Sequence, residues 1–247
     1  MRDFLQALSF LTILPVGRTA LSGDKELARS MAFYPMTGLV LGLLLYLGYW
    51  LFSLLFPKPL VLWATIGLLA FLTRSLHLDG FADTIDGLAS GGTKENILEV
   101  MRDSRIGSFG VIGLIFLVGA KYFSLDQLPK EFIFSSLILM AVMGRHSIVL
   151  VCYRSPYARS GEGLARPFTE NLGPLETAVS VGTALGIALW LGGMKGILVF
   201  SGVTLFSLGY RLFFVKKVGG ITGDILGAAN ELAELLCLVL LVLLAGY

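Results

Sequence analysis

The sequence has little charge for its length. Only 15% of its 247 residues are charged, whereas 55% are hydrophobic. This composition lies outside the range of soluble globular domains and indicates an integral membrane protein. The net charge of +2 is too small to indicate a nucleic-acid partner, so we expect none. No linker-like stretch divides the chain, and we therefore expect a single domain over residues 1–247.

Cysteine and histidine are scarce. Cys152 and Cys237 are far apart and lack metal-ligand spacing, which argues against a disulfide framework or a zinc site. His77 and His146 are isolated, and we expect structural hydrogen bonding from each, with His77 better placed for a further role because it lies beside aspartates. The N-terminal segment has too short an apolar part for a signal peptide and contains Asp3, so we expect a retained amphipathic segment.

Long apolar runs predict an all-α, polytopic membrane helical bundle. About seven runs could each cross roughly 30 Å of hydrocarbon as a helix. The Gly-rich part of the chain, residues 182–196, would also fit a re-entrant pair. The predicted spans are 34–56, 60–76, 107–123, 132–151, 176–192, 196–214 and 225–246.

The cations favour one side of this predicted bundle. If the spans alternate, fifteen Lys and Arg residues, Arg18 and Arg145 among them, fall in one set of loops, and only four fall in the other. By the positive-inside tendency, the N-terminus and the long charged loops face the cytoplasm and the C-terminus lies outside. We therefore expect a multi-pass protein of the cytoplasmic (inner) membrane. The four cations of the second set are Lys58, Lys121, Lys130 and Lys195.

The stretch HLDGFADTIDG, residues 77–87, places three carboxylates at a span end. Asp79, Asp83 and Asp86 share an arc of about 60° on a helix, where like charges repel. Ionisable groups near a bilayer are costly, so the default interpretation is functional. Mg²⁺ binds through one or two carboxylates together with substrate phosphates, which this face offers. Gly80 and Gly87 should interrupt an ordinary helix and allow a close backbone approach.

A second acidic set lies in GGITGDILGAANELAELLCL. Asp224 and Glu231 are seven residues apart and nearly superimposed on a helix, with Glu234 one turn further along. Asp224 could simply cap the last helix, whereas the two glutamates would lie at or within the last span. On the predicted topology both acidic sets face the cytoplasm, so they could converge on one site.

Arginines between the two acidic sets indicate phosphate binding. MRDSRIGSFG supplies Arg102, Asp103 and Arg105, while Arg145 and Arg159 follow later in the chain. The planar guanidinium binds phosphate through two parallel hydrogen bonds, although each arginine alone could be a topological anchor. Acids for a metal and arginines for phosphate together predict phosphoryl transfer at the membrane surface. We expect residues 153–174 to cover the nucleotide, with a mobile linker as the alternative.

HLDGFADTIDGLASGG followed by MRDSRIGSFGVIGLI resembles the signature of the cobalamin synthase family, the cobinamide-GDP ribazoletransferases. FLTILPVG, FYPMTGLVLG, GRHSIVLVCYRSPYAR and TGDILGAANELAE extend the resemblance over most of the chain. It implies Mg²⁺-dependent transfer from adenosylcobinamide-GDP to α-ribazole or its 5′-phosphate, with release of GMP. It leaves room for a homo-oligomer in the bilayer.

The resemblance and the residue chemistry together suggest roles. Asp79, Asp83 and Asp86 would bind the metal, and the arginines at 102, 105, 145 and 159 would contact phosphate. The remaining acids, Asp103, Asp224 and Glu231, could hold a second metal or act as the base toward the incoming hydroxyl.

Three other classes fit the sequence less well. A CDP-alcohol phosphotransferase of lipid synthesis needs an Arg after its D-G-x-x-A pattern, where this chain has Asp83. A polytopic prenyltransferase needs two Asp-rich motifs. A secondary transporter would place its acids near the middle of the spans, whereas these acids lie mainly at span ends on one side.

Overall fold

A computed structural model describes residues 1–16, 23–161 and 163–245. Three sequence predictions lie partly outside these residues: the loop position of Arg18, the segment 153–174 at residue 162, and the last residue of the span 225–246. The described part is helical and contains no strand apart from one isolated bridge between Tyr157 and Ile221, which confirms the all-α fold class. In chain order the elements are α1 (Arg2–Leu11), α2 (Asp24–Ser30), η1 (Met31–Phe33), α3 (Tyr34–Ser53), α4 (Lys58–Leu72), α5 (Leu76–Ser90), α6 (Lys94–Val100), α7 (Ser108–Gln127), η2 (Lys130–Phe132), α8 (Ile133–Cys152), α9 (Arg166–Asn171), α10 (Pro174–Val218) and α11 (Gly223–Ala245).

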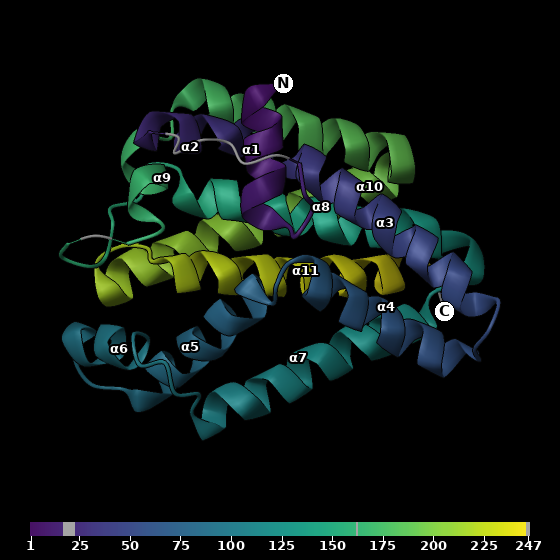
Figure 1. Ribbon diagram of the computed structural model, residues 1–247, viewed down its shortest axis with the longest axis horizontal. Helices are drawn as coiled ribbons and strands as arrows, with labels where there is room; N and C mark the ends of the chain where they lie inside the picture. Colours follow the sequence, from purple (N-terminus) through teal and green to yellow (C-terminus); the bar gives the residue numbers. More distant parts are fainter. Residues whose placement is uncertain (17–22, 162, 246–247) are drawn as a thin grey trace.

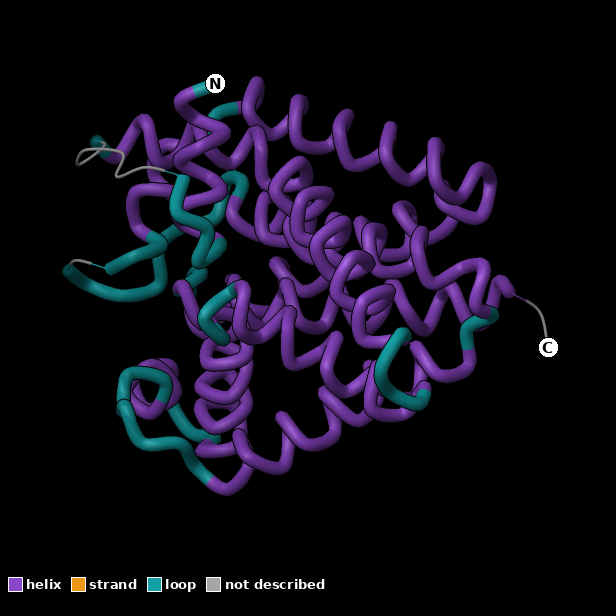
Figure 2. Tube along the Cα trace, turned by 45° about the vertical axis from the view of Figure 1, so that its right-hand side comes forward, coloured by secondary structure: helices purple, strands orange, loops and turns teal. Residues whose placement is uncertain are grey.

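Five helical segments among the described residues are long and apolar enough to cross a membrane, and the pair α4 and α5 would make a sixth. The predicted count of about seven is therefore not established. α10 has 45 residues and contains one non-helical residue, Gly193, with φ 53° and ψ −130°. The helix folds back there (Figures 1 and 2), and a Cβ on Gly196 would collide with the carbonyl of Ala188. Its two arms correspond to the predicted spans 176–192 and 196–214.

A sharp bend separates α4 from α5. The two helices meet at 90°, and Arg74 and Ser75 between them both have φ 54°. Non-glycine residues rarely adopt this left-handed conformation, so the surrounding structure must hold it. Arg74 Nη2 donates to the Thr12 carbonyl over 3.1 Å, and the Ile13 amide donates to the Leu72 carbonyl over 2.8 Å. The segment after α1 thus stabilises the bend, which directs the axis of α5 away from that of α4.

α8 forms the centre of the bundle, and nearly all of its side chains are buried. Glycines let α3 pack directly on its backbone: a Cβ on Gly42 would lie 2.4 Å from the Cα of Ile138, and one on Gly38 would lie 2.6 Å from the carbonyl oxygen of Ala141. Close backbone approach at small residues is typical of helix packing in membranes. Large apolar side chains such as Trp63, Phe116 and Trp190 are exposed on the outer helices. The chain is a multi-pass membrane protein.

The two ends of the bundle differ in their connections. At the end on the left of Figure 1 lie α5, α6, α9 and the start of α11, joined by the longer loops. The opposite end carries the tight turn between α3 and α4 and the C-terminal end of α11. Both acidic segments of the sequence therefore reach the same end of the molecule.

Candidate functional site

A close crossing of α5 and α11 builds the site. A Cβ added to Gly80 would lie 2.9 Å from both the Cα and the carbonyl oxygen of Asp224. One turn further along α11, a Cβ on Gly227 would lie 3.3 Å from the Cα of His77. The predicted close backbone approach at Gly80 is confirmed, but the predicted interruption is wrong, because α5 continues through Gly80 and Gly87. The crossing places the carboxylates of both helices side by side.

The carboxylates at this crossing have too few cationic partners. Asp224 accepts hydrogen bonds from Arg159 Nη2 over 2.8 Å and from the Thr222 hydroxyl over 3.2 Å. The carboxylates of Asp79 and Asp83 have no hydrogen-bond or ion-pair partner within the described part of the chain. Asp83 lies within Coulombic reach of Asp79, Asp86 and Asp224, with Arg159 as the opposing charge. The fold thus brings Asp79, Asp83, Asp224 and Arg159 together and leaves negative charge unneutralised.

The backbone of the chain holds Arg159 in place. The Ala158 amide donates to the Ile221 carbonyl over 3.1 Å, and the Ile221 amide donates to the Pro156 carbonyl over 2.9 Å. Gly220 permits this pairing, since a Cβ there would lie 2.4 Å from the Pro156 oxygen. Thr222 caps α11 by accepting a hydrogen bond from the Ile225 amide, so the capping role considered for Asp224 belongs to its neighbour. Asp224 is consequently free to face Arg159.

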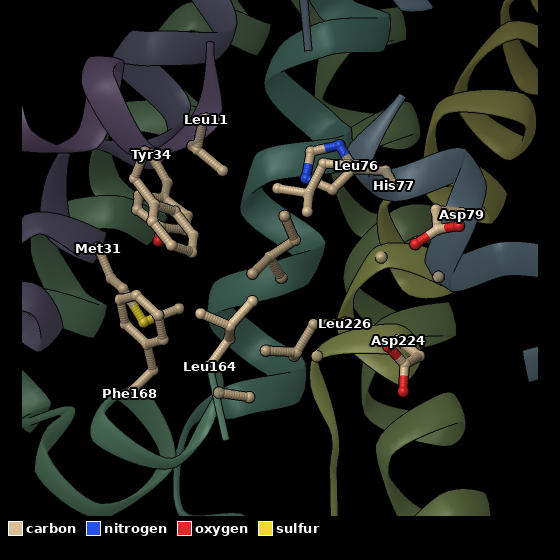
Figure 3. A pocket seen from close by; sticks show the side chains of 16 residues that line it. Leu11, Met31, Tyr34, Leu76, His77, Asp79, Leu164, Phe168, Asp224 and Leu226 are labelled. Carbon is tan, nitrogen blue, oxygen red and sulfur yellow. The ribbon is translucent and has the colours of Figure 1, made fainter. Parts of the chain in front are cut away.

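A pocket of about 140 Å³ opens beside the two acids. Asp79 and Asp224 lie on one side, and Tyr34, Met31 and Phe168 lie on the other (Figure 3). The walls come from α1, the start of α3, α5, α8, the segment before α9, α9 itself and α11. The site therefore combines a carboxylate-lined side with a large apolar side.

Asp86 has a different environment from the other two aspartates of α5. Its carboxylate accepts hydrogen bonds from the amides of Gly107, over 2.7 Å, and Gly110, over 2.8 Å, at the start of α7. A Cβ on either glycine would approach the carboxylate to 2.3 or 2.4 Å. Asp86 therefore accepts hydrogen bonds from free amides at the start of α7, and its negative charge lies at the positive end of the helix dipole. This structural role accounts for Asp86 without the predicted metal.

The predicted residues Asp103 and Arg105 form a pair on the surface. Arg105 Nη2 lies 2.7 Å from Asp103 Oδ2, and the Arg105 side chain is 87% exposed. These hydrogen bonds lower the pKa of Asp103 to about 2. A base works best when its pKa lies near the working pH, so the geometry does not favour Asp103 as the base. Asp103 and Arg105 line a groove with Asp86, and the exposed Arg102 lies on a neighbouring groove.

The other two predicted residues lie in a buried charged network inside the bundle. Lys121 Nζ is 2.6 Å from both Glu231 Oε2 and Glu234 Oε2, and Arg145 is paired with Glu234. At most 5% of any of these four side chains is exposed. Neither Arg145 nor Glu231 lines the pocket beside Asp79 and Asp224. The predicted convergence of the two acidic sets thus holds for Asp224 and not for the glutamates.

Lys121 is the member of this network that the sequence interpretation missed. Because the predicted span 107–123 ends close to Lys121, the sequence places this lysine at an outer loop. In the structure α7 continues to Gln127, and Lys121 is buried. Arg145 likewise lies within α8 and not in a cytoplasmic loop. The spacing of Glu231 and Glu234 inside an apolar helix was the signal that a buried cation had to exist.

The acids at the crossing of α5 and α11 offer few ligands to a metal ion. Within the described ranges, no three His, Cys, Asp or Glu side chains are grouped so that they could hold a metal ion by themselves. Mg²⁺ commonly uses one or two carboxylates and takes its other ligands from substrate phosphates and water. Asp79 and Asp83, which lack partners, suit that mode of binding.

Comparison with known proteins shows that the chain has relatives that are similar to it over nearly its whole length. A family model described as cobalamin-5-phosphate synthase matches residues 3–242. A protein of Geotalea daltonii named adenosylcobinamide-GDP ribazoletransferase is 37% identical over 246 residues, which cover 100% of this chain and 99% of the relative. Proteins of the same name from Syntrophobacter fumaroxidans and Escherichia coli O17:K52:H18 are each 39% identical, covering 95% and 96% of this chain and 96% and 98% of the relatives. No solved structure matches significantly. The chain belongs to the cobalamin-5-phosphate synthase family.

Proposed function

We propose that this protein transfers the adenosylcobinamide phosphate group of adenosylcobinamide-GDP to α-ribazole or its 5′-phosphate. The products are adenosylcobalamin, or its 5′-phosphate, and GMP. The reaction assembles the nucleotide loop of the cobamide. The observation that carries the proposal is the match to relatives of this name over almost the whole chain, combined with an end of the bundle where partnerless acids face an arginine.

The proposed reaction is a substitution at phosphorus. The ribose 3′-hydroxyl oxygen of the acceptor forms a bond to the phosphorus attached to cobinamide, and the bond from that phosphorus to the oxygen bridging to GMP breaks. The hydroxyl proton passes to a base, and GMP leaves with the electrons of the broken bond. Positioning and charge stabilisation suffice for such a step, so the protein needs no covalent intermediate.

The chain's own residues suit three tasks in this reaction. Arg159 offers a guanidinium, held by the backbone pairing of residues 156–158 with Ile221, that can bind a diphosphate oxygen. Asp224 has its carboxylate on the pocket wall, in a position to accept the hydroxyl proton once the diphosphate binds Arg159. Asp83 extends the negative surface along α5 toward Asp86. Arg102 and Arg105, on grooves next to this surface, are available for the distal part of the donor.

The cofactor we propose is Mg²⁺, held by Asp79 and Asp83. When bound it would neutralise negative charge on the diphosphate and on the departing GMP. The fit rests on the charge imbalance of the site, where, among residues 1–16, 23–161 and 163–245, three carboxylates have the guanidinium of Arg159 as their one opposing charge. A divalent cation supplies the missing positive charge.

The direct test is to incubate the purified protein with adenosylcobinamide-GDP, α-ribazole and Mg²⁺ and to measure GMP and the cobamide product. We expect both products in equal amounts, and none after chelation of the metal. Formation of GMP without acceptor would indicate a hydrolase. Absence of GMP would contradict the transferase assignment and would leave the transporter alternative.

We also propose that the acidic end of the bundle faces the cytoplasm in the inner membrane. Cys152 and Cys237 are buried, so cysteines introduced elsewhere can be labelled selectively. In intact cells, a membrane-impermeant maleimide should label E131C, in the turn at the opposite end, and not E95C on α6, although both positions are exposed. Labelling of E95C in intact cells would reverse the orientation.

A further inference from the structure

The pocket beside Asp79 and Asp224 has the size and lining of a binding site for a small aromatic group. Its volume is about 140 Å³. In another protein, an apolar cavity of roughly 150 Å³ binds benzene. Phe10 and Phe168 are 5.2 Å apart between ring centroids, and Tyr34 and Phe168 are 6.4 Å apart. The three rings thus form one continuous aromatic surface on the side away from the acids.

A buried ring nitrogen at the edge of this apolar surface lacks a hydrogen-bond partner among the described residues. His77 lines the pocket and is only 4% exposed, and its Nδ1 has no hydrogen-bond partner within the described residues. In the view of Figure 3 the imidazole lies between the aromatic side and the carboxylate side. A buried polar group without a partner costs free energy, which a ligand carrying a complementary atom would recover.

The acids at the pocket determine which kind of molecule fits. A lipid acyl chain could fill the apolar side, but it would leave the His77 nitrogen and the carboxylates of Asp79 and Asp224 without hydrogen-bond partners. A neutral nucleoside can instead place its base against the aromatic surface, a ring nitrogen at His77 and its ribose hydroxyls at the carboxylates. We propose that this pocket holds the heteroaromatic base of the ribonucleoside acceptor, with His77 recognising a ring nitrogen. This assignment rests on the proposed transfer reaction.

The segment before α9 closes this base pocket. Leu164 lines the pocket although its side chain is 73% exposed, so it lies over the opening and contributes little to the core. The following helix supplies Phe168, which is buried. Residues 163–168, within the segment predicted to cover the nucleotide, therefore contact the acceptor base in this arrangement. The size of the accepted base would depend on them.

Truncating Leu164 tests the proposal with little damage to the fold. In L164A we expect the KM for α-ribazole to rise about tenfold, with kcat and the KM for adenosylcobinamide-GDP nearly unchanged. The matched control is L175A, because Leu175 is 71% exposed on α10 and does not line the pocket. We expect no change in either KM for the control. A rise in the donor KM would show that the pocket holds part of the donor and would overturn the assignment.

A binding measurement without donor separates this inference from the proposed reaction. Calorimetric titration of the wild-type protein with α-ribazole, and with its free base 5,6-dimethylbenzimidazole, should show binding that weakens about tenfold in H77F, which keeps a planar ring without nitrogens. If the wild type binds the nucleoside in this way but forms no product, the pocket assignment stands and the transfer reaction fails. If the wild type does not bind the nucleoside, or if H77F and L164A bind it normally, the pocket assignment is wrong.

Discussion

Two clusters of charge on the same helix, α11, have opposite balances. The inner cluster, Lys121, Arg145, Glu231 and Glu234, contains two cations and two anions and is almost fully buried. The outer cluster, at the crossing of α5 and α11, contains Asp79, Asp83 and Asp224, and among the described residues Arg159 alone opposes them. Seven residues separate Asp224 from Glu231, about 10 Å along a helix.

The difference teaches how a membrane protein uses acidic residues in two ways. Inside the bundle each carboxylate has a cation supplied by another helix, because an unpaired charge there would be very costly. At the end of the bundle the protein leaves carboxylates without a partner, which solvent and a bound cation can compensate. We therefore expect the inner cluster to govern stability and the outer cluster to govern activity.

The largest effect should follow from K121M in the inner cluster. The change leaves two buried glutamates with Arg145 alone, and loss of one partner of a buried pair costs about 3–5 kcal/mol. Thermal unfolding of the detergent-solubilised protein should show a large loss of stability. The control K130M removes an exposed lysine and should change little. In the double variant K121M/E231Q the balance of charge returns, and part of the lost stability should return with it. A single variant as stable as the wild type would contradict the structural role of the inner cluster.

The second prediction concerns D83N in the outer cluster. The change keeps the size of the side chain but removes a negative charge that repels the neighbouring acids. We expect transferase activity to fall by roughly 10²–10³-fold, as when one electrostatic contact is lost from an active site. The metal-free variant should be no less stable than the wild type, because self-repulsion falls, and Mg²⁺ should stabilise the wild type more than the variant.

The control for D83N is D126N, which removes an acid paired with Lys58 at the opposite end of the bundle. It should retain activity. If D83N turned over substrate normally with unchanged Mg²⁺ dependence, the outer cluster would not be the metal site. If D83N were instead clearly less stable than the wild type, the outer cluster would contribute to stability as the inner cluster does.

A third prediction tests the cation of the outer cluster. R159K keeps the charge but removes the planar pair of donors, so we expect a loss of activity of about tenfold with stability nearly unchanged. K25Q, on the exposed surface of α2, serves as the control and should have no effect on turnover. A severe loss of stability in R159K would indicate that Arg159 mainly holds α11 in place through Asp224.

A loss of stability smaller than that of K121M should come from G110A, at the contact between α5 and α7. Its Cβ would lie 2.4 Å from the Asp86 carboxylate, and we expect a loss of about 1–3 kcal/mol from the displacement this forces. G119A on the same helix is the matched control, because no atom lies within 4 Å of the added Cβ. That control should be neutral or gain up to about 1 kcal/mol from helix propensity. Equal unfolding temperatures for the two variants would show that Asp86 moves away at no cost.

Much of the fold follows from local hydropathy. The predicted spans agree with α3, α4, α7, α8, the two arms of α10 and α11 to within a few residues at most ends, because each is an uninterrupted apolar run. The bend at Arg74 and Ser75 could not be predicted, since neither residue favours the left-handed conformation and contacts with Thr12 and Leu72 stabilise the break. The number of crossings stays a prediction.

The site was only partly predictable for a related reason. The spacing of Asp79 and Asp83 on one helix face and the convergence with Asp224 required only helix geometry and a common side of the membrane. The sequence groups Arg145 and Glu231 with these acids because it indicates which side of the membrane a charged residue is near. It does not indicate how deeply that residue is buried in the bundle. Depth depends on tertiary packing, and Lys121, from the opposite set of predicted loops, is the partner that reveals it.

The pairing of Lys121 with Glu231 and Glu234 has a consequence for how the chain is synthesised. The partners are 110 and 113 residues apart, and α11 is the last helix described. At about 5–20 residues per second, the ribosome needs on the order of ten seconds to make the intervening chain. During that time α7 carries an ammonium group whose glutamate partners do not yet exist. The buried ion pairs of α7 therefore form only after α11 has been made, and a chain truncated before α11 would present an unneutralised lysine to the insertion and quality-control machinery of the cell.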